Sequence, residues 1–268
     1  MRSFDNPPAP GEMLALFVSD LHLQESMPAT TAAFLHFLQH QAVKARQLYL
    51  LGDLFEYWAG DDDIDTPFHQ SVVQALRAVS DSGTAIFWIA GNRDFLIGEG
   101  FAIATGATRL QDGIVIELAG QSIVLVHGDA QCTDDVDYIA FRQQVRQPQW
   151  QANFLAQSLA QRKAIIDRMR EQSRTAQRDK TAQIMDVNQA AIARLFADSG
   201  ALRMIHGHTH RPANHATQTG GKQCMRVVLP DWDCDCDAGD TTARRGGWLG
   251  IRGDGAWLRF DWDGRLLA

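Results

Sequence analysis

Residues 202–210 read L-R-M-I-H-G-H-T-H, a mostly apolar run of the kind that forms a β-strand, followed at once by histidines at every second position. Alternate residues of an extended segment point to the same side, so the imidazole rings are expected to share one face. Neutral imidazole is the commonest metal ligand in proteins. Solvated histidines or rings packed against a core would give the same pattern. This stretch alone therefore leaves a metal site and a structural role open.

The same pattern, an apolar run that ends in polar residues, recurs elsewhere along the chain. The runs are LALFVSD at 14–20, LYLLGD at 48–53, AIFWIAGNRD at 85–94 and SIVLVHGD at 122–129. Helix-like stretches near 30–45 and 68–82 separate the first three runs. Strands that alternate with helices predict a layered α/β domain, in which the loops at the strand ends meet at one edge of a sheet.

Helix-like spacing replaces the strand pattern between residues 136 and 199. Apolar residues at roughly three- and four-residue intervals carry this spacing: Leu155, Leu159, Ile166 and Met169. We interpret 136–199 as a helical insertion between two strands of a single domain that spans residues 1–268. After the histidines, 224–233 and 247–262 read as antiparallel strands, and the second segment is a hairpin that turns at 253–255.

The composition is that of a globular protein. A chain of 268 residues with 45% hydrophobic residues can bury a large core. The longest apolar runs are too short to cross a bilayer, and prolines stand near the N-terminus where a signal peptide needs an apolar segment, so we expect a cytoplasmic location. The cysteines are too few and too scattered for a disulfide framework, and free thiols are expected at Cys132, Cys224, Cys234 and Cys236.

The charge is distributed unevenly along the chain. The formal net charge of −7 argues against a nucleic acid partner, since proteins that bind duplexes usually carry an excess of Lys and Arg. Residues 142–180 nevertheless hold nine basic and three acidic residues, a local charge of +6 that leaves −13 for the rest. This segment indicates either an anionic partner or a solvated helix face.

The polar residues at the strand ends follow one another in a specific order of motifs: D-x-H, G-D, G-N-R-D, H-G and G-H-x-H. In this order they resemble the calcineurin-like metallophosphoesterases. Within that superfamily they are most similar to the hydrolases of the bacterial lipid A pathway that split UDP-2,3-diacylglucosamine. The closer match is carried by SDLHL at 19–23, LGDLFEYWAGDDD at 51–63, GNRDFLIG at 91–98, HGDAQCTDD at 127–135, IMDVNQ at 184–189 and HGHTHRP at 206–212.

The resemblance implies a four-layer αββα sandwich with a helical cap insertion and two divalent metal ions, most simply Mn²⁺, at the edge of the sheets. It implies that one metal is held by Asp20, His22 and His210, and the other by Asn92, His127 and His208. Asp53 would bridge the two, and His206 is left with packing or hydrogen bonding. Carboxylate, amide and imidazole ligands without thiolate suit Mn²⁺, Fe²⁺ or Zn²⁺, and a pair of such cations can activate water for attack on phosphorus.

Arg93 departs from the general superfamily, which often has a histidine at this position. Arginine remains charged in proteins and cannot protonate a departing alkoxide. It can bind phosphoryl oxygens and stabilise developing charge, which favours cleavage of a diphosphate, whose phosphate leaves as an anion. The alternative is an ion pair with Asp94. With Arg93, the residues expected to be catalytic are Asp53, Asn92 and His208.

The resemblance also implies that the helical insertion caps the metals and receives the acyl chains and the glucosamine. The matching substrate contacts are Asn92, Arg93, Asp135, Ser173, Gln177, Lys180 and His208. Gln177 stands where relatives often carry Asn. The apolar stripe of the insertion, flanked by Arg162 and Arg168, suits a lipid with an anionic head and a peripheral seat on the cytoplasmic face of the inner membrane, although ordinary core packing would produce the same stripe.

The function that this resemblance implies is metal-dependent hydrolysis of UDP-2,3-diacylglucosamine to UMP and 2,3-diacylglucosamine 1-phosphate (lipid X). A different calcineurin-like phosphodiesterase, a nuclease or a nucleotide pyrophosphatase on the same scaffold is the main alternative. A scaffold that had lost its metals would be expected to show substituted ligands. None of the seven motif positions is substituted in this chain.

Overall fold

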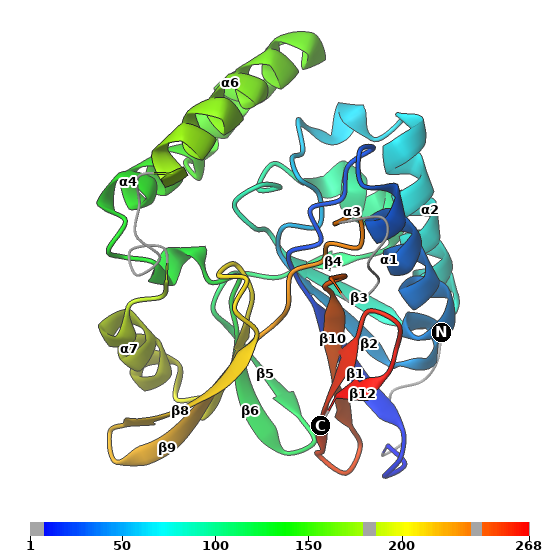
Figure 1. Ribbon diagram of the computed structural model, residues 1–268, viewed down its shortest axis with the longest axis vertical. Coiled ribbons are helices and arrows are strands. Elements are labelled where there is room, and N and C mark those ends of the chain that lie inside the picture. The colour runs from blue at the N-terminus through cyan, green and yellow to red at the C-terminus, as the bar shows by residue number, and fades with distance from the viewer. Residues whose placement is uncertain (1–7, 179–185, 237–242, 268) are drawn as a thin grey trace.

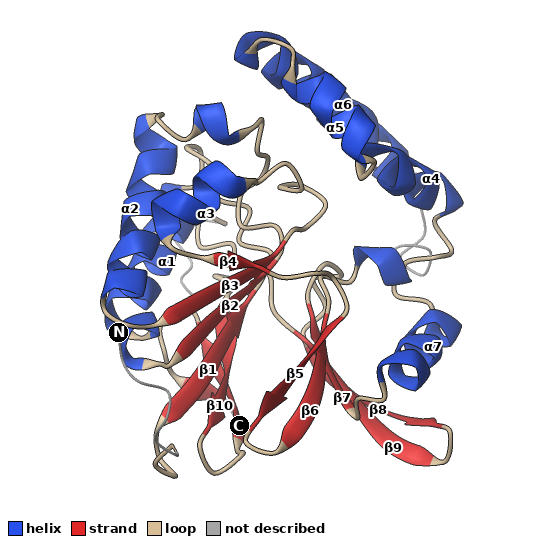
Figure 2. Cartoon of the chain, turned by 180° about the vertical axis from the view of Figure 1, so that it is seen from behind, coloured by secondary structure: helices blue, strands red, loops and turns tan. Residues whose placement is uncertain are grey.

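Two β-sheets packed face to face, with helices on both outer faces, form the body of the molecule (Figures 1 and 2). The computed structural model describes residues 8–178, 186–236 and 243–267, and of residues 172–178 it describes only the backbone. The larger sheet has seven strands in the order β12-β11-β10-β1-β2-β3-β4. The smaller sheet has five strands in the order β5-β6-β7-β9-β8.

The seven-stranded sheet combines a parallel half with an antiparallel half. Strands β1 to β4 pair in parallel, and β10 joins the sheet antiparallel to β1. The hairpin predicted at 247–262 is confirmed as β10 and β11, and the amide of Gly255 donates to the carbonyl of Arg252 across its turn. The strands are β1 (Met13–Val18), β2 (Gln47–Leu51), β3 (Ala85–Ile89), β4 (Thr108–Arg109), β10 (Gly247–Arg252), β11 (Trp257–Asp261) and β12 (Leu266–Leu267).

The five-stranded sheet has a parallel centre and antiparallel edges. Its strands are β5 (Ile114–Leu118), β6 (Gln121–Leu125), β7 (Arg203–His206), β8 (Ala213–Thr219) and β9 (Lys222–Val228). The interpretation of 224–233 as an antiparallel strand is only half right. Strand β9 is antiparallel to the edge strand β8. It is parallel to β7, because the chain reverses direction once between β7 and β8 and again between β8 and β9.

Helices cover the outer face of each sheet, which gives the four expected layers. Helices α1 (Pro28–His40), α2 (Pro67–Asp81) and α3 (Glu99–Thr105) lie on the seven-stranded sheet, and α7 (Gln189–Ser199) lies on the five-stranded sheet. Alternate residues of β2 show the layering: Leu48 and Leu50 pack under the helices, whereas Tyr49 and Leu51 pack between the sheets. Short 3₁₀ turns connect the layers at Ala42–Lys44, Asp61–Asp63 and Asp129–Gln131.

Three helices lie outside the four layers and form what we call the cap: α4 (Val136–Val145), α5 (Pro148–Leu155) and α6 (Leu159–Arg178). In Figure 1 they lie beyond the upper ends of the sheets. The last helix of the expected insertion 136–199, α7, packs on the sandwich, because its Ile192 and Phe196 are buried against Val124 and Met204 of the five-stranded sheet. The division of the chain into a domain and an insertion stays a prediction.

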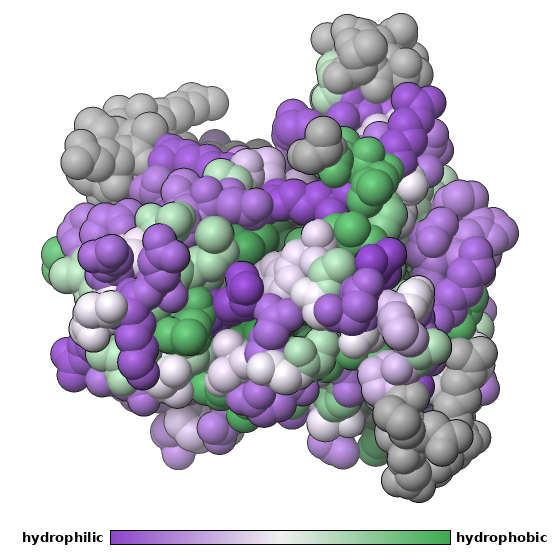
Figure 3. Space-filling model, turned by 90° about the horizontal axis from the view of Figure 1, so that it is seen from below, coloured by the Kyte–Doolittle hydropathy of each residue, from purple (hydrophilic) through white to green (hydrophobic). Residues whose placement is uncertain are grey.

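The surface is ordinary for a globular protein. Seen from below in Figure 3, hydrophilic residues cover most of the molecule and hydrophobic ones form separate patches. Within the described ranges, no helix has the length and apolar character needed to cross a membrane. The four cysteines are free thiols, as expected.

Candidate metal centre

The seven residues expected to bind metal all lie just beyond the C-terminal ends of parallel strands. Asp20 and His22 follow β1, Asp53 follows β2 and Asn92 follows β3. The remaining three, His127, His208 and His210, follow β6 and β7 of the other sheet. Loops from both sheets therefore meet at one edge, and the structure brings together all seven residues in two adjoining clusters.

The first cluster contains Asp20, His22 and His210, each of which offers one ligand atom within 4.8 Å of the others. The Nε2 atoms of His22 and His210 are 3.2 Å apart, and Nε2 of His210 lies 3.6 Å from Oδ1 of Asp20. Two ring nitrogens that face each other at this distance need a proton or a cation between them, because their lone pairs otherwise repel. The arrangement therefore fits a bound cation.

The second cluster contains Asp53, His127 and His208, with the side chain of Asn92 beside them. Oδ1 of Asn92 lies 2.9 Å from Nε2 of His127 and 2.9 Å from Nδ1 of His208. An amide oxygen, two imidazole nitrogens and a carboxylate thus converge on one point. This donor set is typical of sites for divalent transition metals.

Asp53 lies between the two clusters. Its Oδ2 atom is 3.8 Å from Nε2 of His22 in the first cluster and 3.7 Å from Nε2 of His127 in the second. Its other oxygen, Oδ1, accepts a hydrogen bond of 2.8 Å from the backbone amide of Arg93, which fixes the rotation of the carboxylate. The geometry is the one that a bridging ligand needs, and the bridging role remains a prediction.

Glycines beside the candidate ligands leave the space that the ligand side chains occupy. A Cβ atom on Gly91 would lie 2.1 Å from Oδ1 of Asp53, and one on Gly207 would lie 2.0 Å from Oδ2 of Asp20. Both distances are far below van der Waals contact, so any larger residue at either position would displace a carboxylate. The G-N and G-H pairs of the sequence therefore have a steric cause.

Candidate ligands also carry unusual backbone conformations. Those with a positive φ are Asp20 (53°), His22 (48°), Asp53 (54°), His208 (67°) and His210 (53°). Within the described ranges, Ala119 is the only other non-glycine residue with a positive φ. Each such residue costs on the order of 1–3 kcal/mol, and this strain gathers at functional sites.

The outer nitrogens of two rings have partners that fix the tautomer. Nδ1 of His127 donates to the carbonyl of Leu51 at 2.8 Å, so its Nε2 atom keeps a lone pair for the cluster. Nδ1 of His22 lies 3.0 Å from Oε2 of Glu56, a carboxylate that the sequence analysis missed. Partners of this kind orient metal-binding histidines in general.

The electrostatics of the centre also fit cations. Asp20 and Asp53 are buried, with exposures of 0% and 1%. Burial disfavours the protonated ring of His127, but Asp53, Asp129 and Asp20 outweigh it and raise the pKa of His127 to about 9. The site thus stabilises positive charge strongly. The same holds for Asp20. Burial raises the pKa of Asp20, but the neighbouring histidines outweigh burial and lower this pKa below the usual range, so the site favours the ionised carboxylate.

His206, the third histidine of the opening stretch, has the packing role expected of it. The ring is fully buried, its Nδ1 donates to the carbonyl of Gly207 at 2.8 Å, and its Nε2 lies 3.0 Å from a guanidinium nitrogen of Arg226. Burial, with Arg226 beside it, lowers the pKa of His206 to about 3. The ring is therefore neutral.

Arg93 does not form the alternative ion pair with Asp94. The two carboxylate oxygens of Asp94 accept from the backbone amides of Gly91 and Leu54, each at 2.8 Å, and brace the turn that carries Asn92. Within the described ranges, Arg93 has no carboxylate at ion-pair distance, and its side chain lines the cavity beside the clusters. Its guanidinium is thus available to a ligand.

A cavity of about 720 Å³ connects the two clusters with the cap. At one end it is lined by His22, Asp53, Asn92 and His208. At the other end apolar side chains of the cap line it: Phe141, Trp150, Phe154, Ile166 and Met169. The cavity therefore combines a polar part, which is suited to binding cations, with an apolar part.

Among the predicted substrate contacts, Asn92, Arg93, Asp135 and His208 line this cavity. Asp135 also accepts a hydrogen bond of 3.2 Å from the amide of Tyr138 and so caps the start of α4. Ser173 and Gln177 lie on α6, where their side chains are not described, and Lys180 lies outside the described residues. Sequence reasoning missed Tyr138, whose ring lies near that of His208 with centroids 6.2 Å apart.

Four of the basic residues of 142–180 hold the cap on the sandwich. The ion pairs join Arg142 to Asp129, Arg162 to Asp62, Lys163 to Asp63 and Arg170 to Glu56. The charge asymmetry of the sequence is thus no sign by itself of an anionic partner. The apolar stripe is divided too, since Ile166 and Met169 face the cavity whereas Leu155 is exposed.

Comparison with known proteins identifies the family. Residues 13–212 match the calcineurin-like phosphoesterases. The chain is 50% identical over 223 residues to a UDP-2,3-diacylglucosamine hydrolase of Aromatoleum aromaticum, with 83% of this chain and 91% of the relative covered. Hydrolases of the same name from Cellvibrio japonicus and Escherichia coli are 47% and 48% identical, each with 82% of this chain and 91% of the relative covered. The chain belongs to the calcineurin-like phosphoesterase family.

Proposed function

We propose that this protein hydrolyses the diphosphate of UDP-2,3-diacylglucosamine, giving UMP and 2,3-diacylglucosamine 1-phosphate, as a step of lipid A biosynthesis. The observation that carries the proposal is the cavity of about 720 Å³, whose lining combines candidate metal ligands with apolar cap residues. Such a cavity suits a substrate with a diphosphate between a nucleoside and an acylated sugar. The names of the relatives point to the same substrate.

The chain's own residues would hold two divalent cations, which we propose to be Mn²⁺. Asp20, His22 and His210 would hold one, Asn92, His127 and His208 would hold the other, and Asp53, which lies between the two clusters, would be shared. Bound cations of this kind activate water for in-line attack on phosphorus and neutralise charge on the phosphoryl oxygens. The phosphorus on the UMP side is the one attacked, and no side chain of the protein is needed as nucleophile.

Arg93 would bind the diphosphate. It lines the cavity, no carboxylate among the described residues lies at ion-pair distance from it although Glu56 is near, and its N–H donors lie in one plane that suits phosphoryl oxygens. It cannot give up a proton at neutral pH, so the bond to the leaving oxygen breaks without protonation by this residue. A sugar 1-phosphate leaves readily as an anion, which matches a diphosphate substrate.

The cap would receive the lipid half of the substrate. Phe141, Trp150 and Phe154 form an apolar wall for the acyl chains, and Asp135 lies where it can accept hydrogen bonds from the glucosamine. Contacts from Ser173, Gln177 and Lys180 are proposed on the resemblance alone. An insoluble substrate also requires access to lipid, so we propose that the protein works in the cytoplasm, peripherally bound to the inner membrane.

A metal-replacement experiment tests the proposal. The protein is treated with a chelator, Mn²⁺, Zn²⁺ or Mg²⁺ is restored separately, and turnover of UDP-2,3-diacylglucosamine is compared with that of a chromogenic phosphodiester. We expect restored turnover of the lipid nucleotide, fastest with Mn²⁺, and slower turnover of the diester. Failure to cleave the lipid nucleotide with every metal, while the diester is cleaved, would leave a different phosphodiesterase as the function.

A further inference from the structure

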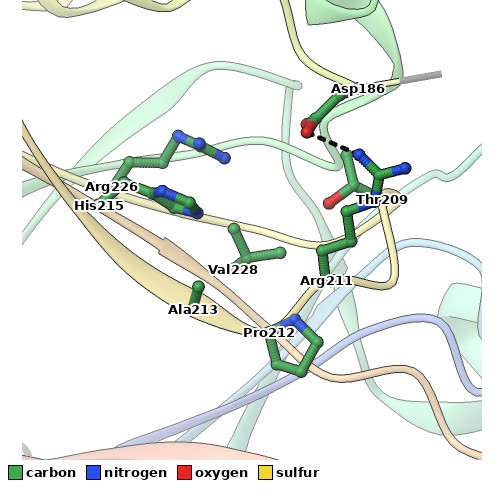
Figure 4. A pocket seen from close by; sticks show the side chains of 8 residues that line it. All are labelled: Asp186, Thr209, Arg211, Pro212, Ala213, His215, Arg226 and Val228. Carbon is green, nitrogen blue, oxygen red and sulfur yellow. Dashed lines mark hydrogen bonds and ion pairs between the residues drawn. The ribbon is translucent and has the colours of Figure 1, made fainter. Parts of the chain in front are cut away.

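A second, smaller cavity of about 210 Å³ lies beside the metal centre on the five-stranded sheet (Figure 4). Its walls come from the loop after β7, the hairpin of β8 and β9, and the turn before α7. Pro212, Ala213 and Val228 give it an apolar side. Drug-sized ligands occupy roughly 300–1,000 Å³, so this cavity suits a single small ring.

Arg226 supplies a buried positive charge to this cavity, and Asp186 across the cavity stabilises it without forming an ion pair with it. Its side chain comes from β9 and is only 4% exposed. One guanidinium nitrogen lies 3.0 Å from Nε2 of His206, which is neutral, and within the described ranges no carboxylate forms an ion pair with Arg226. A buried cation without an ion-pair partner is costly unless an electron-rich atom comes close to it.

Further polar groups surround Arg226 in the cavity. A guanidinium nitrogen of Arg211 lies 2.8 Å from Oδ2 of Asp186, as the dashed line in Figure 4 shows, so these two charges balance each other. The hydroxyl of Thr209 is buried without a hydrogen-bond partner. The ring of His215 stands next to Arg226, and burial together with Arg226 lowers its pKa, which leaves it neutral. The cavity thus offers several donors and one carboxylate acceptor.

The small cavity adjoins the large one. Thr209 and Arg211 line both cavities, and both residues belong to the segment H-T-H-R, which also carries His208 and His210. A molecule whose phosphate lies at the metal centre can therefore extend into either cavity. The apolar cap residues of the large cavity suit the acyl chains, so the nucleoside half of the proposed substrate can extend the other way, past Thr209 and Arg211 into the small cavity.

We propose that the small cavity binds the pyrimidine ring of the nucleotide half, with Arg226 donating to a ring carbonyl. Uracil presents two carbonyl acceptors on either side of one N–H donor, and the cavity offers guanidinium donors together with the carboxylate of Asp186. The flat faces of the ring would rest between Pro212 and Val228. This inference rests on the proposed function, since a substrate without a nucleoside would have no use for the cavity.

Binding measurements on the Mn²⁺-loaded protein test the inference. Isothermal titration calorimetry compares UMP, ribose 5-phosphate, AMP and inorganic phosphate as ligands. We expect UMP to bind about tenfold more tightly than ribose 5-phosphate, the difference that one well-made hydrogen bond to a charged donor supplies. AMP, whose ring is larger, is expected to gain nothing over ribose 5-phosphate. Equal affinity for UMP and ribose 5-phosphate, or for AMP and UMP, overturns the assignment.

Two variants on β8 sharpen the test. Ala213→Leu fills the cavity from its wall, whereas Ala216→Leu makes the same change on an exposed position of the same strand. The preference for UMP over ribose 5-phosphate is expected to disappear in the first variant and to persist in the second. If circular dichroism shows that Ala213→Leu does not fold, Arg226→Lys takes its place, because it keeps the charge and loses the forked donors. A preference that survives in the variant overturns the assignment.

The outcome can be separated from that of the proposed function. If UMP binds with the expected preference while UDP-2,3-diacylglucosamine is not hydrolysed, the nucleotide cavity stands and the substrate is another uridine nucleotide. If the lipid nucleotide is hydrolysed while UMP binds no better than ribose 5-phosphate, the function stands and the cavity assignment is wrong.

Discussion

Two regions that line the same large cavity are held in place by different means. We define the metal edge as the seven candidate ligands at the strand ends. Each of them lies just beyond the end of a buried parallel strand, and the carboxylates of Asp20 and Asp53 are at most 1% exposed. The cap is anchored by ion pairs in addition to apolar packing, since Phe154 of α5 is buried in the core cluster beside the seven-stranded sheet. Arg162, Lys163 and Arg170 of α6 form ion pairs with acids of the loop that follows β2.

This difference indicates that the metal edge positions the reacting groups, whereas the cap accommodates the lipid part of the substrate. Buried strands hold ligand atoms within tenths of an ångström, which phosphoryl transfer at a metal pair requires. We infer that the cap, which is held partly by ion pairs at its edge, can adjust its apolar wall to long acyl chains. Changes at the metal edge should therefore affect every substrate, and changes in the cap should affect the lipid nucleotide alone.

The largest effect is expected at Asp53. Asp53→Asn removes the negative charge that contacts both clusters, and a loss of about 4 kcal/mol of transition-state stabilisation corresponds to a rate lower by roughly 10³-fold. Turnover of both the lipid nucleotide and a chromogenic diester should fall together. Asp198→Asn, on an exposed position of α7, is the matched control. Near-normal turnover of either substrate by a folded Asp53→Asn protein would refute the bridging role.

The next effect is expected at Glu56, which connects the two regions. Its Oε2 lies 3.0 Å from Nδ1 of His22 and its Oε1 accepts from Arg170 of the cap at 2.7 Å. Glu56→Gln keeps the shape of the side chain and removes the charge that orients His22, so metal affinity should fall about 10–100-fold. Competition with a chelator of known affinity measures this.

Arg170→Met separates the two roles of Glu56. If Glu56 acts on the metal edge directly, the Arg170 variant keeps its metal affinity and loses affinity for the lipid nucleotide only. Should Glu56→Gln leave metal affinity unchanged, Glu56 belongs to the anchoring of the cap, and the two regions are more separate than we infer.

The metal edge is the part of the molecule that sequence predicts best, and the reason is physical. Each candidate ligand follows a buried parallel strand. Both can be recognised from neighbouring residues in the sequence: the strand as an apolar run and the ligand as the polar residue after it, as in LYLLGD, which ends at Asp53. Strand β8 cannot be recognised in this way because it is a polar edge strand, ANHATQT. Glu56 was missed because its partner His22 lies 34 residues away, and nothing local shows that they meet.

The cap was predicted only in part for the same reason. Helical spacing at 136–199 is correct for α4 to α7, but whether a helix joins the cap or the sandwich depends on its partner. Arg162 reads as a solvated or lipid-facing charge in the sequence, yet it is 2% exposed and pairs with Asp62, a hundred residues earlier. Long-range pairing of charges is not encoded in local periodicity.

A smaller effect, limited to one substrate, is expected in the cap. Phe141 of α4 lines the apolar end of the cavity, and Phe141→Ala removes surface whose burial is worth about 1.5–3 kcal/mol, so KM for the lipid nucleotide should rise about tenfold or more. Turnover of the diester should not change. Val136→Ala, on an exposed position of the same helix, is the control. Equal losses for both substrates would show that the cap shapes the metal edge.

The smallest effect on turnover is expected at His206, which lies beside the metal edge in sequence but packs against its neighbours instead of contacting the clusters. His206→Gln keeps a donor for Gly207 and an acceptor for Arg226, so turnover at pH 7 should stay within about twofold of the parent. The pKa of His206 is lowered from 6.5 to about 3, so between these values unfolding takes up a proton and stability falls as the pH falls. Between pH 7 and pH 5 the free energy of unfolding is expected to fall by about 2 kcal/mol because of His206. Urea unfolding should therefore show a shallower decline for the variant than for the parent, and parallel curves would mean that His206 is not held neutral.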